Sequence, residues 1–151
     1  MLYEAEEVLG LIPQREPVVM VSRLIDASGN RCHTGLSVTA DNYFIEDDGL
    51  MAETGLIEHI AQSASAFAGH RYRMQSLPAP IGYIGEVRKF HCYRRPAIGD
   101  ELQTEIIFEA EAEGVTLMSA TTSCNGEAVA DTKMKIFVEP VRQLPCNAAE
   151  R

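Results

Sequence analysis

The stretch LIEHIAQSASAFAGH, residues 56–70, places a carboxylate in a run that has the pattern of a buried helix. Apolar residues recur at positions 56, 57, 60, 64, 67 and 68, the i, i+3, i+4 spacing of a helix that packs on a core. Small residues at 61, 63–66, 68 and 69 let other backbones approach nearly every side. We predict a central helix from Ala52 or Thr54 to about Tyr72, which leaves Glu58 in need of an explanation.

Strand-like segments lie on both sides of this helix in the sequence. A short amphipathic helix in the first ten residues is followed by two of them, 18–27 and 31–39. Four more follow the long helix, at 83–94, 101–113, 115–124 and 127–139, and we expect these to form a meander. One helix cannot cover both faces of six strands. The predicted α+β architecture is therefore a curved antiparallel sheet wrapped around that helix, whose remaining face and edges favour pairing with a second copy.

Length and composition indicate one ordinary globular domain. The chain has 151 residues, of which 46% are hydrophobic and 23% charged. We expect the domain to span 1–139, followed by a loosely held tail at 140–151, which has two prolines and few anchors. No apolar run approaches the roughly 20 residues that cross a bilayer. The acidic start lacks the features of a signal peptide, so we expect a cytoplasmic protein without a membrane partner.

Charge and cysteine spacing exclude several classes of function. A net charge of -9 argues against nucleic acid, which requires many basic contacts. The four cysteines are widely scattered, so we expect reduced thiols rather than a zinc site, and no glycine-rich loop implies a cofactor. Six of the thirteen basic residues fall between positions 71 and 95, namely Arg71, Arg73, Arg88, Lys89, Arg94 and Arg95. They would steer an anionic partner or simply form a solvated face.

Four segments together resemble one enzyme family. LIPQREPVVMVSRLID (11–26), MAETGLIEHIAQSA (51–64), KFHCYRRPAIGDEL (89–102) and VTLMSATTSCNGEAVADTKMKIFV (115–138) are similar, in this order, to segments of the β-hydroxyacyl-acyl carrier protein dehydratases of fatty acid synthesis and their relatives in polyene lipid pathways. This resemblance implies a single hotdog domain. It also implies an acyl thioester substrate, carried by acyl carrier protein or coenzyme A, and the loss of water from it.

The same resemblance assigns roles to residues near the start of the helix. Glu58 falls on the family's catalytic carboxylate, and Gln62 on the glutamine one helical turn later. We expect Gln62 to bind substrate with Glu58, and the backbone N–H groups around Thr54 and Gly55 to polarise the thioester carbonyl. No metal is implied. Without the resemblance, a capping role or a salt bridge to an arginine would be the simpler interpretation of Glu58, with Arg15 and Arg88 as candidates.

The family's loop histidine is missing. Its position holds Phe44, or Leu50 in the shorter loop of the polyene-pathway relatives, and the histidine of the opening segment is Gln14. We expect the chain's own four histidines to serve in packing or at the surface, with His33 and His91 relevant only if their strands face Glu58.

Three functions therefore stay open. The chain is a dehydratase whose second group is a non-matching residue or a partner chain, an acyl thioesterase that uses Glu58 alone, or a non-catalytic partner subunit of an active dehydratase. The expected assembly is a homodimer or higher homo-oligomer, or a mixed dimer with a histidine-bearing paralogue.

Overall fold

A computed structural model describes residues 1–139, which form one antiparallel sheet and one long helix. The predicted tail, 140–151, lies outside the described residues. In chain order the elements are β1 (Tyr3–Glu4), α1 (Glu6–Leu9), β2 (Arg23–Ser28), β3 (Arg31–Ser37), α2 (Glu53–Met74), β4 (Ile81–Cys92), β5 (Glu101–Ala112), β6 (Val115–Cys124) and β7 (Glu127–Glu139).

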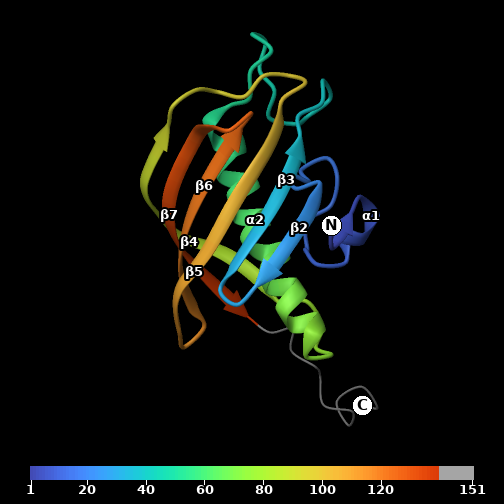
Figure 1. Ribbon diagram of the computed structural model, residues 1–151, viewed down its shortest axis with the longest axis vertical. Coiled ribbons are helices and arrows are strands. Elements are labelled where there is room, and N and C mark those ends of the chain that lie inside the picture. The colour runs from blue at the N-terminus through green and yellow to red at the C-terminus, as the bar shows by residue number, and fades with distance from the viewer. Residues whose placement is uncertain (140–151) are drawn as a thin grey trace, which may run out of the picture.

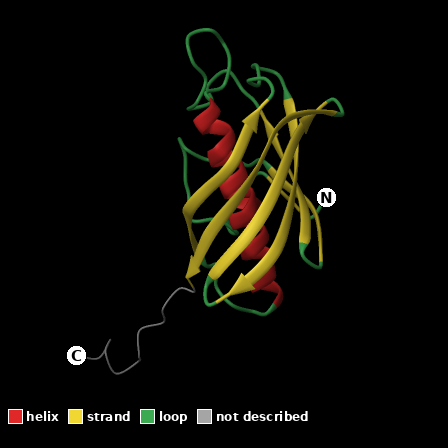
Figure 2. Cartoon of the chain, turned by 90° about the vertical axis from the view of Figure 1, so that its left-hand side faces the viewer, coloured by secondary structure: helices red, strands yellow, loops and turns green. Residues whose placement is uncertain are grey.

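The sheet curves around α2, which runs across its concave face (Figures 1 and 2). This is the hotdog arrangement that the sequence predicts, and the helix agrees with the predicted span to within about two residues at either end. Small residues allow the close packing. A Cβ added at Gly69 would lie 2.1 Å from the carbonyl oxygen of Leu11, so only glycine permits the N-terminal segment to cross α2 at that point.

Strand order departs from the predicted meander. Strands β5, β6 and β7 do follow one another across the sheet, and the turn at Asn125 and Gly126 has positive φ at both residues, as an NG hairpin requires. β4, however, pairs with β7 at the far edge, while β5 pairs with β3. The order is β1-β2-β3-β5-β6-β7-β4, which leaves one side of β4 without a neighbouring strand among residues 1–139.

The first predicted strand begins five residues later than expected, at Arg23 instead of Val18. Backbone groups just before it bond to side chains of α2 instead of to a strand. The carbonyl of Val18 accepts from Gln62, and the peptide N–H of Met20 donates to the same side chain. This segment therefore runs along the helix as an irregular chain, and it fixes the position of the residues that precede it.

The interior is mostly apolar, but one line of polar contacts joins α2 to the sheet, and a separate pair joins Ser63 on α2 to Thr34 on β3. His59 is fully buried, with Nε2 2.7 Å from the hydroxyl of Thr104, which in turn lies 2.7 Å from that of Thr122. Within the described part of the chain, neither helix is long and apolar enough to cross a membrane.

Candidate active site

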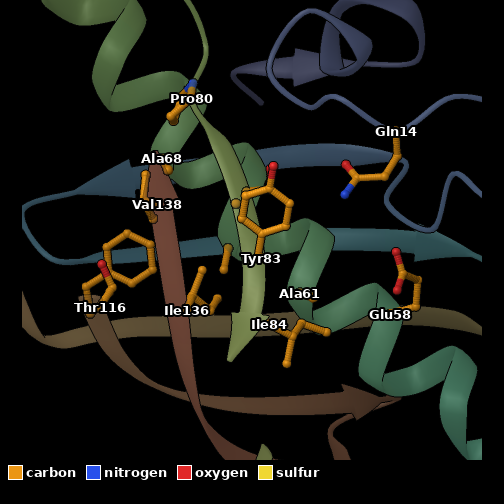
Figure 3. A pocket seen from close by; sticks show the side chains of 14 residues that line it. Gln14, Glu58, Ala61, Ala68, Pro80, Tyr83, Ile84, Thr116, Ile136 and Val138 are labelled. Atoms are coloured by element: carbon orange, nitrogen blue, oxygen red, sulfur yellow. The ribbon is translucent and has the colours of Figure 1, made fainter. Parts of the chain in front are cut away.

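A cavity of about 280 Å³ lies between one face of α2 and the strands at the β4 edge of the sheet (Figure 3). Its volume is close to the lower end of the roughly 300–1,000 Å³ of typical small-molecule sites. Small and apolar side chains dominate the lining, which consists of Gln14, Glu58, Ala61, Ala64, Ser65, Ala68, Pro80, Gly82, Tyr83, Ile84, Phe108, Thr116, Ile136 and Val138. Glu58 is the only carboxylate among them.

Glu58 is oriented by Gln62, one turn further along α2. Nε2 of Gln62 donates a hydrogen bond of 2.8 Å to Oε1 of the carboxylate. The same amide is held by the backbone of the segment before β2, because Nε2 also donates to the carbonyl of Val18 over 2.7 Å and Oε1 accepts from the N–H of Met20 over 2.6 Å. One carboxylate oxygen is thus fixed, and Oε2 has no hydrogen-bond partner among residues 1–139.

Gln62 does not itself line the cavity. It is fully buried, and the three contacts described above account for its carbonyl and for both hydrogens of its amide. The residue that we predicted to bind substrate therefore lies beside Glu58 but behind it, where it is suited to orient the carboxylate.

The start of α2 does not line this cavity, although it lies only one turn before Glu58. Thr54 is exposed, and the N–H of Gly55 already donates to the carbonyl of Ala52 over 2.9 Å. Gly55 is buried against Phe44 and Met51, which lie less than 3 Å from the place of an added Cβ. The structure does not bring Thr54 or Gly55 to the cavity that Glu58 lines.

Gln14 also lines the cavity, although the sequence predicted no role for it. It sits in the turn before β2, and Figure 3 shows its side chain at the same end of the cavity as Glu58. Within residues 1–139 its Oε1 is buried without a hydrogen-bond partner. The available signal was its position, since Gln14 replaces the histidine of the family's opening segment.

None of the four histidines lines the cavity. Half-buried His33 lies between Asp26 and Glu105, and exposed His91 contacts Asp131. The remaining two pack inside or against the fold: His59 in the polar line beneath α2, and His70 with its Nδ1 3.1 Å from the hydroxyl of Tyr3. The expectation of packing and surface histidines is confirmed.

The arginines considered for Glu58 bond elsewhere. Arg15 donates to the carbonyls of Ile12 and Gln14, and Arg88 pairs with Glu86. The salt-bridge interpretation of Glu58 is therefore wrong.

Most of the basic segment is also neutralised. Arg71, Arg88, Arg94 and Arg95 each form an ion pair, which leaves only Arg73 and Lys89 of the six without one in the described chain.

A second cavity of about 280 Å³ continues in the direction of the C-terminal end of α2. It shares four lining residues with the first, namely Ala68, Phe108, Thr116 and Val138. Its far side is formed in part by Arg71 and Glu111, which make a two-pronged ion pair with both N···O distances at 3.0 Å. Phe108 is almost fully buried and packs on Phe67, so the wall between the two cavities is firm.

Similar proteins carry dehydratase names. A family profile described as "ApeP-like: ApeP dehydratase" matches residues 6–145. The 3-hydroxyacyl-[acyl-carrier-protein] dehydratase FabZ of Pasteurella multocida (strain Pm70) is 24% identical over 146 residues, covering 92% of this chain and 93% of the relative. The same enzyme of Histophilus somni (strain 2336) is 24% identical over 141 residues, covering 88% and 90%.

Solved structures share the fold. The dehydratase heterocomplex ApeI:P from Xenorhabdus doucetiae includes a chain that superposes with a TM-score of 0.83 at 19% identity, covering 89% of this chain and 91% of that one. Cj0977 from Campylobacter jejuni superposes with a TM-score of 0.67 at 14% identity, covering 91% and 98%. Because the family profile spans nearly the whole sequence, the chain belongs to the ApeP-like dehydratase family.

Proposed function

We propose that this protein removes water from 3-hydroxyacyl thioesters of fatty acid or polyene lipid metabolism, with Glu58 as the group that moves protons. The observation that carries the proposal is the position of Glu58, a single carboxylate at one end of an otherwise small and apolar cavity. An acyl chain fits such a lining, and a carboxylate that Gln62 holds in one orientation meets the geometric need of general acid–base catalysis.

The chemistry balances with one carboxylate. Glu58 takes the proton from the carbon next to the thioester carbonyl, and the electron pair released there forms the carbon–carbon double bond. The bond between the next carbon and its hydroxyl breaks, and the hydroxyl receives a proton and leaves as water. Glu58 can return the proton it took, or a partner group can supply it. No oxidant, metal or cofactor enters this balance.

A second chain along β4 is part of the proposal. The unpaired edge of β4 carries exposed Tyr83, Ile84 and Val87, and the neighbouring β7 adds exposed Phe137. An apolar edge of this length favours pairing with another strand. Tyr83 and Ile84 also line the cavity, so a chain bound there would lie next to the site.

The choice of occupant depends on what the cavity lacks. The occupant would be a second copy or, since no histidine of residues 1–139 reaches Glu58, a paralogue that supplies one. The related ApeI:P structure is described as a heterocomplex, which supports the mixed form for this chain.

The carrier is acyl carrier protein or coenzyme A. Free thiols at Cys32, Cys92 and Cys124 support a reducing, cytoplasmic location. Of the six basic residues between positions 71 and 95, Arg73 and Lys89 form no ion pair in the described chain, so these two are the candidates to bind an anionic carrier.

A non-catalytic partner role is the second candidate, and the absence of a histidine at the cavity of the described chain favours it. The purified protein should be incubated with 3-hydroxyacyl and enoyl thioesters while enoyl absorbance and free thiol are followed together. Interconversion without thiol release is the result we expect. Thiol release would indicate the thioesterase instead. No change in enoyl absorbance or in free thiol would leave the partner role.

A further inference from the structure

We propose that the side-chain amide of Gln14 binds the 3-hydroxyl of the substrate, and so selects hydroxyacyl over saturated and enoyl thioesters. The inference rests on the proposed function and deepens it. It assigns a role to a residue in the turn between α1 and β2, outside the helix that carries Glu58.

The unpaired oxygen of Gln14 calls for a ligand. Buried polar atoms in folded proteins almost always have a hydrogen-bond partner, and leaving one without a partner has a cost in stability. Among residues 1–139, Oε1 of Gln14 is the one buried side-chain oxygen or nitrogen without a hydrogen-bond partner. Gln14 also lines the cavity. A ligand with a hydroxyl would remove this cost.

The turn that carries Gln14 is held in place from three directions. Nη1 of Arg15 bridges the carbonyls of Ile12 and Gln14 at 2.8 and 2.7 Å. On the N-terminal side, Leu11 is fully buried and its carbonyl lies against Gly69. On the C-terminal side, the amide of Gln62 donates a hydrogen bond to the carbonyl of Val18. The amide is therefore presented to the cavity by a fixed backbone, as recognition groups generally are.

A hydroxyl is the ligand group that fits. An amide oxygen accepts a hydrogen bond and an amide nitrogen donates one, while a hydroxyl does both. The partnership therefore holds whichever way the amide is turned. In the reaction, only the 3-hydroxyacyl form has a hydroxyl at this end of the chain. Because the amide neither gains nor loses a proton at ordinary pH, Gln14 binds and orients the leaving group while Glu58 moves the proton.

The test compares two ligands that differ only in the hydroxyl. Turnover is stopped with Glu58→Gln, and calorimetry measures binding of a 3-hydroxyacyl-pantetheine and of the saturated acyl-pantetheine of the same length. With Gln14 intact we expect the hydroxyl compound to bind more tightly. Adding Gln14→Ala should lower its affinity about tenfold, the equivalent of one hydrogen bond to a buried group, and leave that of the saturated compound unchanged. Exposed Gln103 on β5 provides the control, since Gln103→Ala should alter neither affinity.

A second measurement does not depend on ligand. Gln14→Leu removes the unpaired oxygen at similar size, so it should raise the melting temperature of the free protein while it abolishes the hydroxyl preference. Equal affinities for the two ligands before any change at Gln14, or a preference that survives Gln14→Ala, would overturn the inference while the proposed function stands. If neither thioester binds, the proposed function itself fails.

Discussion

The backbone of one residue, Met20, connects the buried core to the candidate catalytic acid. Its N–H donates to Gln62, which holds Glu58, and its carbonyl accepts from Nδ1 of His59 over 2.6 Å. Since Nδ1 must carry the hydrogen, Nε2 accepts from the hydroxyl of Thr104. A neutral histidine of defined tautomer therefore anchors the segment on which the orientation of Glu58 depends.

The protonation of His59 should control stability in weak acid. Burial, with a smaller contribution from the charge of Arg23, lowers the pKa of His59 to about 4 from 6.5. The unfolded chain therefore binds a proton that the folded one does not, so stability is fully present above about pH 6.5. It should fall by on the order of 3 kcal/mol as the pH drops to about 4. Urea unfolding at several pH values will measure it.

The control separates His59 from the carboxylates that titrate in the same range. His59→Gln keeps a hydrogen-bonding side chain without the titration, so its loss of stability in this window should be smaller than that of the wild type. His91→Gln, at an exposed position, should behave as the wild type. If His59→Gln and the wild type lose the same free energy between pH 6.5 and 4, the neutral-histidine anchor is wrong.

At the scale of elements, successive residues of α2 line the cavity at increasing distances from Glu58. Ala61, Ser65 and Ala68 lie on the same face as Glu58 and line the cavity in that order. A helix rises about 1.5 Å per residue, so these positions lie about 4, 10 and 15 Å beyond the carboxylate. Their small side chains leave the path open as far as the wall that includes Phe108.

Larger side chains on this face should shorten the accepted acyl chain in proportion to their position. The longest acyl chain that Ser65→Leu accepts should be shorter than the longest that Ala68→Leu accepts, because Ser65→Leu blocks the cavity nearer to Glu58. Initial rates over a series of enoyl thioesters will show the two limits, and each variant serves as the other's control. If both variants show the same limit of acyl-chain length, or lose activity equally at every length, the acyl chain does not lie along α2.

The sequence predicted those features of the structure that local residue patterns determine, and it missed those that depend on contacts distant in the chain. Helical periodicity located α2, and the resemblance placed Glu58 on it. The pairing of β4 with β7 was missed because strand order depends on contacts distant in sequence. The segment 18–20 was wrongly predicted as strand because its backbone bonds go to Gln62 and His59, which no local pattern shows. Gln14 was missed as a site residue since a turn has no periodicity that points into a cavity.

At the scale of the whole molecule, the proposed assembly depends on the edge of β4. Val87 is 37% exposed at this edge and does not line the cavity. Val87→Lys places a charge where another strand would pair, so we expect the mass measured by light scattering to fall to that of a single chain, or a copurifying partner to be lost. Leu77→Lys, at a more exposed position in the loop before β4, should leave the assembly intact. An assembly that survives Val87→Lys would place the interface elsewhere.

The most direct test of the account compares two carboxylates on the same helix. Glu58→Gln keeps an acceptor for Gln62, so the fold and the cavity are preserved, and only the proton chemistry is removed. Glu53→Gln makes the same change at an exposed position just over one turn earlier. With enoyl absorbance as the readout, we predict that Glu58→Gln lowers the rate of interconversion by roughly 10²–10⁴-fold, while Glu53→Gln retains the wild-type rate. Equal rates in the two variants would show that Glu58 does not carry the reaction.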